Sequence, residues 1–454
     1  MSDSNLDLAV IGAGPAGLSA ATKARMLGLG VALIDEQPRL GGQIYRSIDT
    51  VDAWASNILG PDYVKGAVIA DRFRQSGARY IPGATVWNIT RDGSVTYLRD
   101  GRSQSLKAKC LIVASGAMER PFPIPGWTLP GVMGAGAAQI MLKTSRAVPS
   151  GNVVLAGCGP LLYLLAAQYV RAGATIGALI DTTARRDYLR ASPHLIGALL
   201  GWRDLRKGLG MLAALRKARV PFFAGASQLR VEGTGRTESF VFNHRGKSVR
   251  IETSLVLLHQ GVVPNTQISW ALRAEHRWNP SQHCFEPLTD AYGMIPDSHV
   301  YLAGDGRGIV GAQAAAVQGV LAAIGVGAEL GVVADRSKEG APLVRQLRKF
   351  TRSRPFLNAL YEPKVENRVP AGAEVIVCRC EEVTAAQIRG YVSQGCQGPN
   401  QTKAFGRCGM GPCQGRFCGL TVTQLIADAL GGAEDDVGYY RIRPPIKPVR
   451  LGQI

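Results

Sequence analysis

The sequence lacks any apolar run long enough to cross a membrane, and its N-terminus lacks the basic and then apolar pattern of a secretory signal. The opening residues, MSDSNLD, lead directly into an apolar stretch of the kind that forms a strand. These absences predict a cytoplasmic protein with no membrane span.

Acidic residues are scarce, because 34 Asp and Glu oppose 52 Lys and Arg, which gives a formal net charge of +18. Such an excess of positive charge can favour binding to nucleic acid, to an anionic membrane surface or to an acidic protein partner. The basic residues are scattered, however, and the one dense group, residues 345–354, is typical of a solvated helix face. Since no nucleic-acid-binding motif accompanies it, we expect no nucleic-acid partner.

Cysteine is sparse in the first 370 residues, where Cys110, Cys158 and Cys284 stand alone. Neither CxxC nor CxxxxC occurs there, so a dithiol reductase is not expected. The other six cysteines crowd between Cys378 and Cys418. Clustering in a reducing compartment indicates a metal site rather than disulfides.

What is present begins with a strand, turn, helix, strand and acid over residues 6–35, in a chain of 454 residues that predicts two to four domains. Gly12 permits the tight turn, Gly14 lets the backbone approach a pyrophosphate, and Gly17 lets the helix lie close to the sheet. Asp35 follows the second strand, where a carboxylate meets a ribose hydroxyl. The turn as a whole is Gly12, Ala13, Gly14, Pro15, Ala16 and Gly17. In this register the pattern predicts a dinucleotide site.

Three later segments predict contacts with a flavin dinucleotide. Glu36 and the paired-glycine turn with Gly42 and Gln43 come soon after Asp35, and Gln43 is a candidate polar neighbour of the flavin ring. Residues 111–117 form a buried strand that ends in small residues, Ala114, Ser115 and Gly116. A further strand ends at Gly304 and Asp305, ahead of a small-residue helix that includes Ala312. Asp305 can accept a ribityl hydroxyl, and the helix N-terminus favours the negative edge of the ring.

A second unit of the same kind spans residues 152–181, after a proline-rich crossing at 121–130. Gly157, Gly159 and Pro160 form its turn and Asp181 ends its second strand, but Leu162 stands at the third glycine position, where we expect it to push the helix outward. Asp181 favours a free 2′-hydroxyl, whereas the neighbouring Arg185 and Arg186 could hold a 2′-phosphate. NAD(P) binding at this second site therefore stays an open prediction.

The cysteine-rich segment combines CxC at Cys378 and Cys380 with CxxxxC at Cys408 and Cys413. Thr384 is expected to cap a helix, and neighbouring glycines can offer backbone amides to sulfur. Four thiolates on two short loops suit either an iron–sulfur cluster or structural zinc. Both remain open on spacing alone.

The glycine turn with Asp35, the Ala114–Gly116 segment, the second turn at Gly157 and the Gly304–Asp305 pair together resemble the two-dinucleotide-binding-domain flavoproteins over residues 6–330. That resemblance implies FAD bound across the first turn and the Gly304–Asp305 strand. The cysteine segment resembles the bacterioferritin-associated-ferredoxin-like [2Fe-2S] domain. By that resemblance the ligands are Cys378, Cys380, Cys408 and Cys413, with Cys418 as the alternate for the last; Cys396 and Cys418 are otherwise expected to be packed thiols.

These patterns predict an α/β fold with two Rossmann-like domains and a small helical [2Fe-2S] domain. The expected boundaries are 1–120 with 290–335 for the FAD-binding domain, 121–289 for the second nucleotide domain, 336–372 for a basic linker, 373–435 for the cluster domain and 436–454 for a tail.

The whole chain, including residues 41–46, resembles the FAD-containing subunits of heteromeric amine dehydrogenases, among them opine oxidases, hydrogen cyanide synthase and proline or hydroxyproline dehydrogenases. The resemblance implies oxidative cleavage of an octopine- or nopaline-type opine to an amino acid and a keto acid. It implies an amino-acid-oxidase-like partner that oxidises the amine, and it allows a small ferredoxin-like subunit, FMN at a subunit interface and ATP in the second nucleotide site. No catalytic residue is identified in this chain, which fits a relay of electrons.

Three alternatives stay open. One is an NAD(P)H-dependent flavin reductase that feeds a ferredoxin, and it requires nicotinamide at the Gly157 site. Another is the flavoprotein subunit of a proline or hydroxyproline dehydrogenase or of hydrogen cyanide synthase. The third is a scaffold without enzymatic activity that docks partners.

Overall fold

The first sheet forms around β1 (Leu6–Ile11), an apolar strand with a fully buried centre. The structure is a computed structural model that describes residues 6–454. β1 pairs in parallel with β2 (Val31–Ile34) and β6 (Arg102–Val113), and β19 (Val300–Leu302) returns from late in the chain to pair with β6. Apolar runs of this kind are typical of parallel strands that are covered on both faces.

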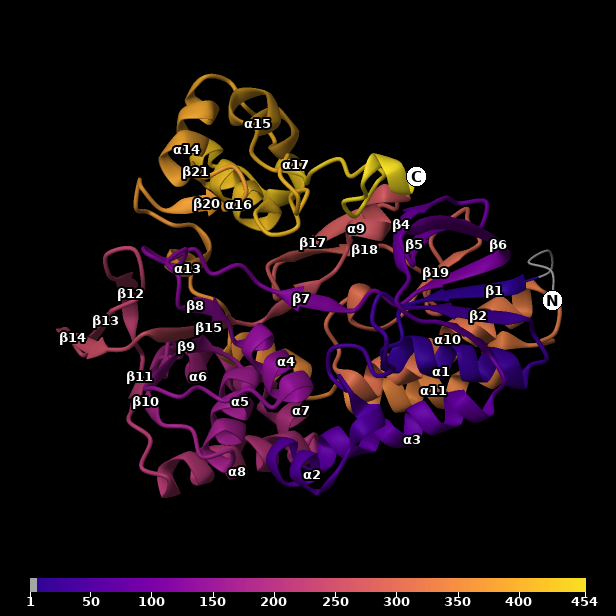
Figure 1. Cartoon of the computed structure of the whole chain (residues 1–454), viewed down its shortest axis with the longest axis horizontal. Helices are drawn as coiled ribbons and strands as arrows, with labels where there is room; N and C mark the ends of the chain where they lie inside the picture. Colours follow the sequence, from indigo (N-terminus) through magenta and orange to yellow (C-terminus); the bar gives the residue numbers. More distant parts are fainter. Residues whose placement is uncertain (1–5) are drawn as a thin grey trace.

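Helices and a short meander complete this domain. α1 (Pro15–Met26) and α10 (Ala312–Glu329) pack so closely that a Cβ on Gly319 would lie 2.0 Å from the carbonyl oxygen of Ala16. Figure 1 shows these helices on one side of the sheet, with α3 and α11 beside them. The remaining elements are β3 (Arg79–Ile81), β4 (Thr85–Ile89), β5 (Ser94–Arg99), η1 (Ile48–Thr50), α2 (Ala53–Leu59) and α3 (Pro61–Gln75).

The second domain contains five parallel strands in the order β11-β10-β9-β15-β8. Their bounds are β8 (Val132–Gly134), β9 (Val153–Cys158), β10 (Ile176–Asp181), β11 (Phe222–Ala224) and β15 (Leu255–Gln260). The helices of this domain are α4 (Ala135–Ser145), α5 (Pro160–Arg171), α6 (Arg185–Ala191), η2 (Ser192–His194), α7 (Leu195–Leu200) and α8 (Trp202–Lys217). A meander of β12 (Ser227–Glu232), β13 (Ser239–His244) and β14 (Lys247–Glu252) extends from it.

Two crossing strands join the domains. β7 (Ala117–Glu119) leaves the first domain and pairs in antiparallel fashion with β16 (Val262–Pro264), which returns to it. After β16 the chain continues through α9 (Gln267–Ala271), β17 (His276–Asn279), β18 (Cys284–Pro287) and, after β19, η3 (Gly304–Gly306). Because both connections cross at one place, the glycine turns of the two domains face a shared space between them.

Residues 336–372, for which the sequence indicated a linker, form three helices: α11 (Arg336–Phe350), α12 (Arg354–Leu360) and α13 (Val365–Arg368). The cysteine-rich segment forms a separate small unit at the top of Figure 1. It comprises β20 (Ile376–Cys378), β21 (Val383–Thr384), α14 (Ala385–Ser393), α15 (Pro399–Gly406), α16 (Gly419–Leu430) and α17 (Glu434–Val437), and the chain ends after η4 (Leu451–Gln453). Trp127 anchors this unit, since its Nε1 donates to the Ile376 carbonyl oxygen at 2.7 Å.

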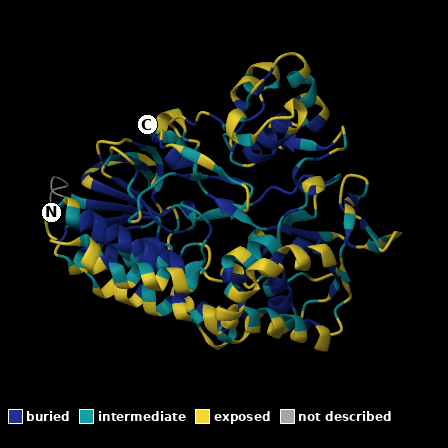
Figure 2. Ribbon diagram, turned by 180° about the vertical axis from the view of Figure 1, so that it is seen from behind, coloured by how far each residue is buried: buried dark blue, intermediate teal, exposed yellow. Residues whose placement is uncertain are grey.

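Among the described residues one helix, α10, is long and apolar enough to cross a membrane by length and composition. Two thirds of it is buried inside the protein against α1 and the first sheet. Figure 2 shows the sheet strands buried and the outer helices exposed on one side.

Candidate functional site

The turn after β1 leaves open space at the N-terminus of α1. A Cβ on Gly12 would lie 2.4 Å from the Ala114 carbonyl oxygen, and one on Gly17 would lie 1.8 Å from the Gly12 carbonyl oxygen, so internal packing requires both glycines. Gly14 differs, because its Cβ would meet nothing closer than 3.9 Å. Space that the protein leaves empty above Gly14 fits a ligand whose phosphates approach the backbone amides of the helix N-terminus.

Asp35 lies at the end of β2, directly beneath this turn. Its side chain is only 8% exposed, and it accepts hydrogen bonds from the backbone amides of Ala13 and, at 2.6 Å, Gln37. Burial raises the pKa of Asp35, and the two amide bonds oppose that effect. The next residue, Glu36, forms an ion pair at 2.8 Å with Lys447 of the C-terminal tail.

The paired-glycine turn packs against the first turn. A Cβ on Gly42 would lie 2.8 Å from the Cα of Gly14, so the two turns touch through their backbones. The Gln43 side chain accepts a hydrogen bond from Arg46 at 2.7 Å. Lys143, on α4 of the second domain, donates to the carbonyl oxygens of Gln43 at 3.2 Å and Ile44 at 2.9 Å. The second domain therefore fixes the conformation of this turn.

The two remaining predicted segments lie at the ends of neighbouring strands β6 and β19. Ser115, after β6, donates to the Asn265 carbonyl oxygen at 2.8 Å. Oδ1 of Asp305, after β19, accepts from the backbone amides of Val310 at 2.8 Å and Gly311 at 3.0 Å, which holds the loop that leads into α10. The carboxyl ends of adjacent parallel strands meet here, as expected for a ligand site in an open α/β sheet.

These segments line one cavity of about 1730 Å³ between the domains. All the predicted flavin residues line it except Ala13 and Gly17, which lie beneath the turn. Sequence reasoning missed two cations in the cavity wall, Arg46 and Lys143, which are both less than a tenth exposed. Burial and the nearby Arg46 charge lower the pKa of Lys143 to about 7. No local pattern marks Lys143, because apart from Gln139 the groups that it binds, the carbonyl oxygens of Gln43 and Ile44, lie about a hundred residues away.

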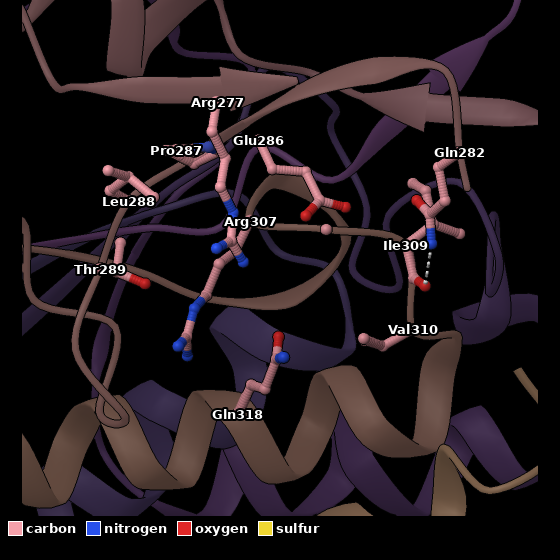
Figure 3. Close-up of a pocket in the computed structure, with 11 residues that line it drawn as sticks. Arg277, Gln282, Glu286, Pro287, Leu288, Thr289, Arg307, Ile309, Val310 and Gln318 are labelled. Atoms are coloured by element: carbon pink, nitrogen blue, oxygen red, sulfur yellow. Dashed lines mark hydrogen bonds between the residues drawn. The ribbon is translucent and has the colours of Figure 1, made fainter. Parts of the chain in front are cut away.

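A second, smaller pocket of about 340 Å³ lies on the other side of the 304–311 loop. Figure 3 shows Arg277 and Glu286 reaching in from the β17–β18 hairpin and Gln318 from α10. Two of its charged groups are engaged locally, since Glu286 accepts from Asn279 at 2.8 Å and Arg307 donates to the Asp290 carbonyl oxygen at 2.6 Å. None of the predicted flavin residues lines this pocket.

The second glycine turn differs from the first in its backbone, because Gly159 has a φ of 111° where Gly14 has a φ of −77°, and the acid that follows it has a different hydrogen-bond partner. α5 begins at Pro160 with Gly159 as N-cap, and Leu162 is fully buried in the core. Asp181 is 2% exposed, and its carboxylate accepts hydrogen bonds from the Tyr163 hydroxyl and, at 2.8 Å, the Thr183 amide. The place where a ribose would meet Asp181 is thus taken by Tyr163, a residue that sequence reasoning missed.

The segment after α12 adds to this cover. The Tyr361 ring lies 6.1 Å from the Tyr163 ring, centroid to centroid, and the Tyr361 carbonyl oxygen accepts from the Cys158 thiol at 3.5 Å. On the other side of the turn, the buried His259 hydrogen-bonds Glu119. These contacts leave less room for a nucleotide next to the turn at Gly157.

The cysteine unit brings three thiols together in its core. The sulfur atoms of Cys378, Cys408 and Cys418 all lie within 4.8 Å of one another, and all three residues are buried. Hydrogen bonds from the Cys408 and Cys418 thiols lower the pKa of Cys378 to about 2. The Tyr440 hydroxyl, fully buried beside them, donates to the Cys408 sulfur at 3.4 Å.

The other predicted ligands form an adjacent pair nearer the surface. Cys380 is exposed, Cys413 is partly exposed, and the two are in hydrogen-bonding contact. The structure therefore places Cys418, rather than Cys413, beside Cys378 and Cys408. Cys396 is buried and hydrogen-bonds the Gly398 carbonyl oxygen at 3.4 Å, so it lies in a different contact.

Two glycine-turn units in tandem, with a late strand returning to the first sheet, define the class of two-domain flavoproteins. The chain belongs to the pyridine nucleotide-disulphide oxidoreductase family, whose model matches residues 6–319. Within it, the chain belongs with the A subunits of opine oxidases. It is 44% identical to the A subunit from Rhizobium meliloti, over 99% of this chain and 87% of the relative, and 45% identical to that from Agrobacterium tumefaciens, over 99% and 91%. These relatives confirm the family that the sequence indicated.

Other matches agree with this placement. Hydrogen cyanide synthase subunit HcnB of Pseudomonas protegens is 30% identical over 98% of this chain and 96% of its own length. Residues 374–454 match the sarcosine oxidase A3 domain. Among solved structures, L-proline dehydrogenase from P. horikoshii has the same fold, with a TM-score of 0.74 at 19% identity over 99% of this chain and 79% of that chain. The FAD-binding Rossmann-type fold is thereby confirmed, and the chain is an oxidoreductase of this flavoprotein family.

Proposed function

We propose that the chain is the FAD- and [2Fe-2S]-containing electron-transfer subunit of a heteromeric enzyme that cleaves an octopine- or nopaline-type opine to an amino acid and a keto acid. The relatives named as A subunits of opine oxidase support the substrate class. The observation that carries the proposal is that one chain holds both a dinucleotide cradle and a buried group of three thiols. When bound, FAD exchanges electron pairs and a [2Fe-2S] cluster exchanges single electrons, so both together permit conversion between the two.

The residues of the first domain fit FAD. Gly14 and Gly116 leave space that no protein atom fills, since a Cβ on Gly116 would meet nothing within 4 Å. Asp35 and Asp305 follow the ends of β2 and β19, where their carboxylates can accept hydrogen bonds from hydroxyl groups of the ligand. The amides at the N-termini of α1 and α10 face the same cavity and favour negative charge.

The cysteine unit fits a thiolate-ligated metal centre. Three buried sulfur atoms within 4.8 Å of one another supply a dense donor set, and Cys380 with Cys413 adds two donors next to it. We propose that the centre draws its ligands from these five residues, with Cys418 among them. Tyr440 donates a hydrogen bond to a ligand sulfur, which adjusts a cluster's reduction potential.

The cavity, among the residues that the structure describes, contains no dithiol and no residue that we assign as the base for an organic substrate. We therefore place amine oxidation on a partner protein of the amino-acid-oxidase type. Arg46 and Lys143 hold the turn at Gln43, and the Arg46 guanidinium adds positive charge to the cavity wall, which favours negatively charged forms of a ligand there.

The alternative of an NAD(P)H-dependent flavin reductase requires nicotinamide at the Gly157 site. The Tyr163 hydroxyl donates a hydrogen bond to Asp181, and the Tyr361 ring lies beside the Tyr163 ring. Because these groups occupy the position expected for the ribose, they argue against that alternative.

The test is purification of the complex from the native host, with flavin and metal quantified and a panel of opines assayed. We expect FAD, iron and sulfide in the preparation and turnover of an opine. Zinc in place of iron would contradict the cluster assignment. A matched Cys408→Ala variant should lose the visible absorption of the cluster and keep FAD, whereas persistence of that absorption would contradict the ligand set.

A further inference from the structure

The second domain carries an unusual concentration of exposed apolar side chains on α6, α7 and α8. Of 21 large apolar side chains that are exposed among residues 6–454, eight fall between positions 188 and 209. They are Tyr188, Leu189, Leu195, Ile196, Leu199, Leu200, Trp202 and Leu209, which we call the α6–α8 patch. Ile196 is 74% exposed, and Leu189 is 75% exposed. Apolar groups gathered in this way usually mark a contact surface.

The charge around the patch is positive and largely unpaired. The segment has two carboxylates: Asp187 is fully buried and ion-paired with Lys364, whereas Asp204 is exposed and accepts a hydrogen bond from the Ser353 hydroxyl at 2.6 Å. Arg206 lies 5.1 Å from the centre of the Trp202 ring. Within residues 185–219, the exposed cations that make no ion pair with a described residue are Arg185, Arg186, Arg203, Arg206, Arg216, Lys217 and Arg219. Asp204 is therefore the one exposed carboxylate among these cations, and the patch presents a net positive charge.

The large cavity connects this patch with the first glycine turn. Residues that line it on one side include Gly14 and Asp35, and on the other they include Tyr188, Leu200 and Trp202. A molecule seated on the patch would consequently cover one end of the space into which the predicted flavin residues face.

We propose that the α6–α8 patch docks another protein subunit of the complex, through a face with an apolar centre edged by aspartate and glutamate. This inference rests on the proposed function, which requires a second subunit. A partner with that charge pattern would pair the free cations, and Trp and Arg are enriched where binding energy concentrates. A second copy of this chain would bring like charges together, and a lipid surface would not fill the concave end of the cavity.

The experiment uses full-length chain tagged at its C-terminus in its own cells, with the co-purifying subunit identified by mass spectrometry and then coexpressed. The test variant is Ile196→Glu with Leu199→Glu. The matched control is Val68→Glu with Val332→Glu, at side chains that are 53% and 48% exposed on other surfaces. We expect the test variant to retain at most a tenth of the partner while its FAD content and melting temperature stay at wild-type values. The control should retain the partner fully.

Each other outcome has a definite meaning. If the test variant retains the partner, or the control loses it equally, the patch assignment is wrong and the proposed function stands. If wild-type chain co-purifies with no subunit, both fail. If the wild-type chain associates with itself and the test variant does not, the patch binds a second copy and the proposal is wrong. If the wild-type chain cosediments with anionic vesicles of phosphatidylcholine and phosphatidylglycerol, at a ratio of about 3:1, and the test variant does not, the patch binds lipid and the proposal is wrong.

A second measurement, on the wild-type complex, keeps the proposal testable if the Ile196→Glu, Leu199→Glu variant fails to fold. Hydrogen exchange in the wild-type complex should show peptides from 195–209 protected relative to the isolated chain. Unchanged exchange there, with protection elsewhere, would overturn the proposal.

Discussion

The Tyr163 hydroxyl donates a hydrogen bond to Oδ2 of Asp181, so the acid that ends the second nucleotide-type unit is satisfied by the chain itself. In the first unit, Asp35 accepts hydrogen bonds from two backbone amides, and no side chain among residues 6–454 is recorded as a donor to it. We therefore expect NADH and NADPH to leave the flavin of the purified protein oxidised on the timescale of turnover. Anaerobic stopped-flow absorbance at the flavin band checks this, and rapid bleaching would restore the flavin reductase alternative.

Tyr163 should also stabilise the fold. In Tyr163→Phe, the buried carboxylate of Asp181 loses a donor, which we expect to lower the free energy of unfolding by about 1–3 kcal/mol. Tyr188→Phe is the matched control, because Tyr188 is 55% exposed and its hydroxyl has no described partner. Urea unfolding followed by circular dichroism measures both, and equal losses would show that the Asp181 contact contributes nothing particular.

Gly14 should be required for the ligand rather than for folding. Its Cβ would lie no closer than 3.9 Å to any protein atom, so we expect Gly14→Ala to fold with a near-normal melting temperature when flavin is removed. The added methyl group fills the cradle, and FAD affinity should fall by about 10-fold or more, since about 1.4 kcal/mol corresponds to each factor of ten. Gly151→Ala, where a Cβ meets nothing within 4 Å, is the control. Fluorescence titration of the apoprotein with FAD gives the dissociation constants, and equal affinities would contradict the site.

Cys418 and Cys396 offer a matched pair of buried thiols in one unit. Because Cys418 lies with Cys378 and Cys408, Cys418→Ala should remove most of the bound metal. Cys396→Ala should keep it, since Cys396 contacts the Gly398 carbonyl oxygen instead. Metal analysis with flavin content as the internal standard distinguishes them. A full complement of metal in Cys418→Ala would return the fourth position to Cys413.

The stability of the protein should fall in mild acid through His276. Its ring stacks on Trp270 with centroids 3.7 Å apart, and burial lowers the pKa of His276 from 6.5 to about 4. The unfolded chain therefore binds this proton below pH 6.5 while the folded protein does not, so folding stability decreases as pH falls from about 6.5 towards 4. The expected contribution is about 1.5 kcal/mol between about pH 6.5 and pH 5. In His276→Phe the loss over that range should shrink by this amount. An undiminished loss in His276→Phe, measured by urea unfolding at both pH values, would contradict the role of His276.

Local patterns could indicate which segments meet at the first glycine turn, because each is fixed by its own strand and turn, and their contact with FAD stays a prediction. Gly12 and Gly17 are required by contacts within the turn, and Asp35 follows a strand whose register the neighbouring strand sets. Gly304 and Asp305 come from far along the chain, yet a strand ending in small residues and an acid was enough to place them. The structure brings these segments to one cavity, as expected.

What the sequence could not predict depends on side-chain direction and on distant partners. The family resemblance favoured Cys413 with Cys418 as the alternate, and the structure places Cys418, the buried N-cap residue of α16, beside Cys378 and Cys408, whereas Cys413 pairs with Cys380. Lys143, in the second domain, binds the turn at Gln43 in the first domain, and Tyr163 of α5 hydrogen-bonds Asp181 at the end of β10. Such contacts follow from how helices pack, which no local motif encodes.

The cysteine unit is fastened at both ends. At its start Ile376 accepts a hydrogen bond from Trp127, and beyond its end the amide of Ile446 donates to the Trp87 carbonyl oxygen at 2.8 Å while Lys447 pairs with Glu36. A unit held in this manner cannot act as a swinging carrier that visits successive docking positions on a flexible tether. Under the proposed function, electrons pass between the flavin site and the cysteine unit over one fixed distance. The rate of that transfer would then depend on the distance and on the driving force, and it would not depend on the viscosity of the solution.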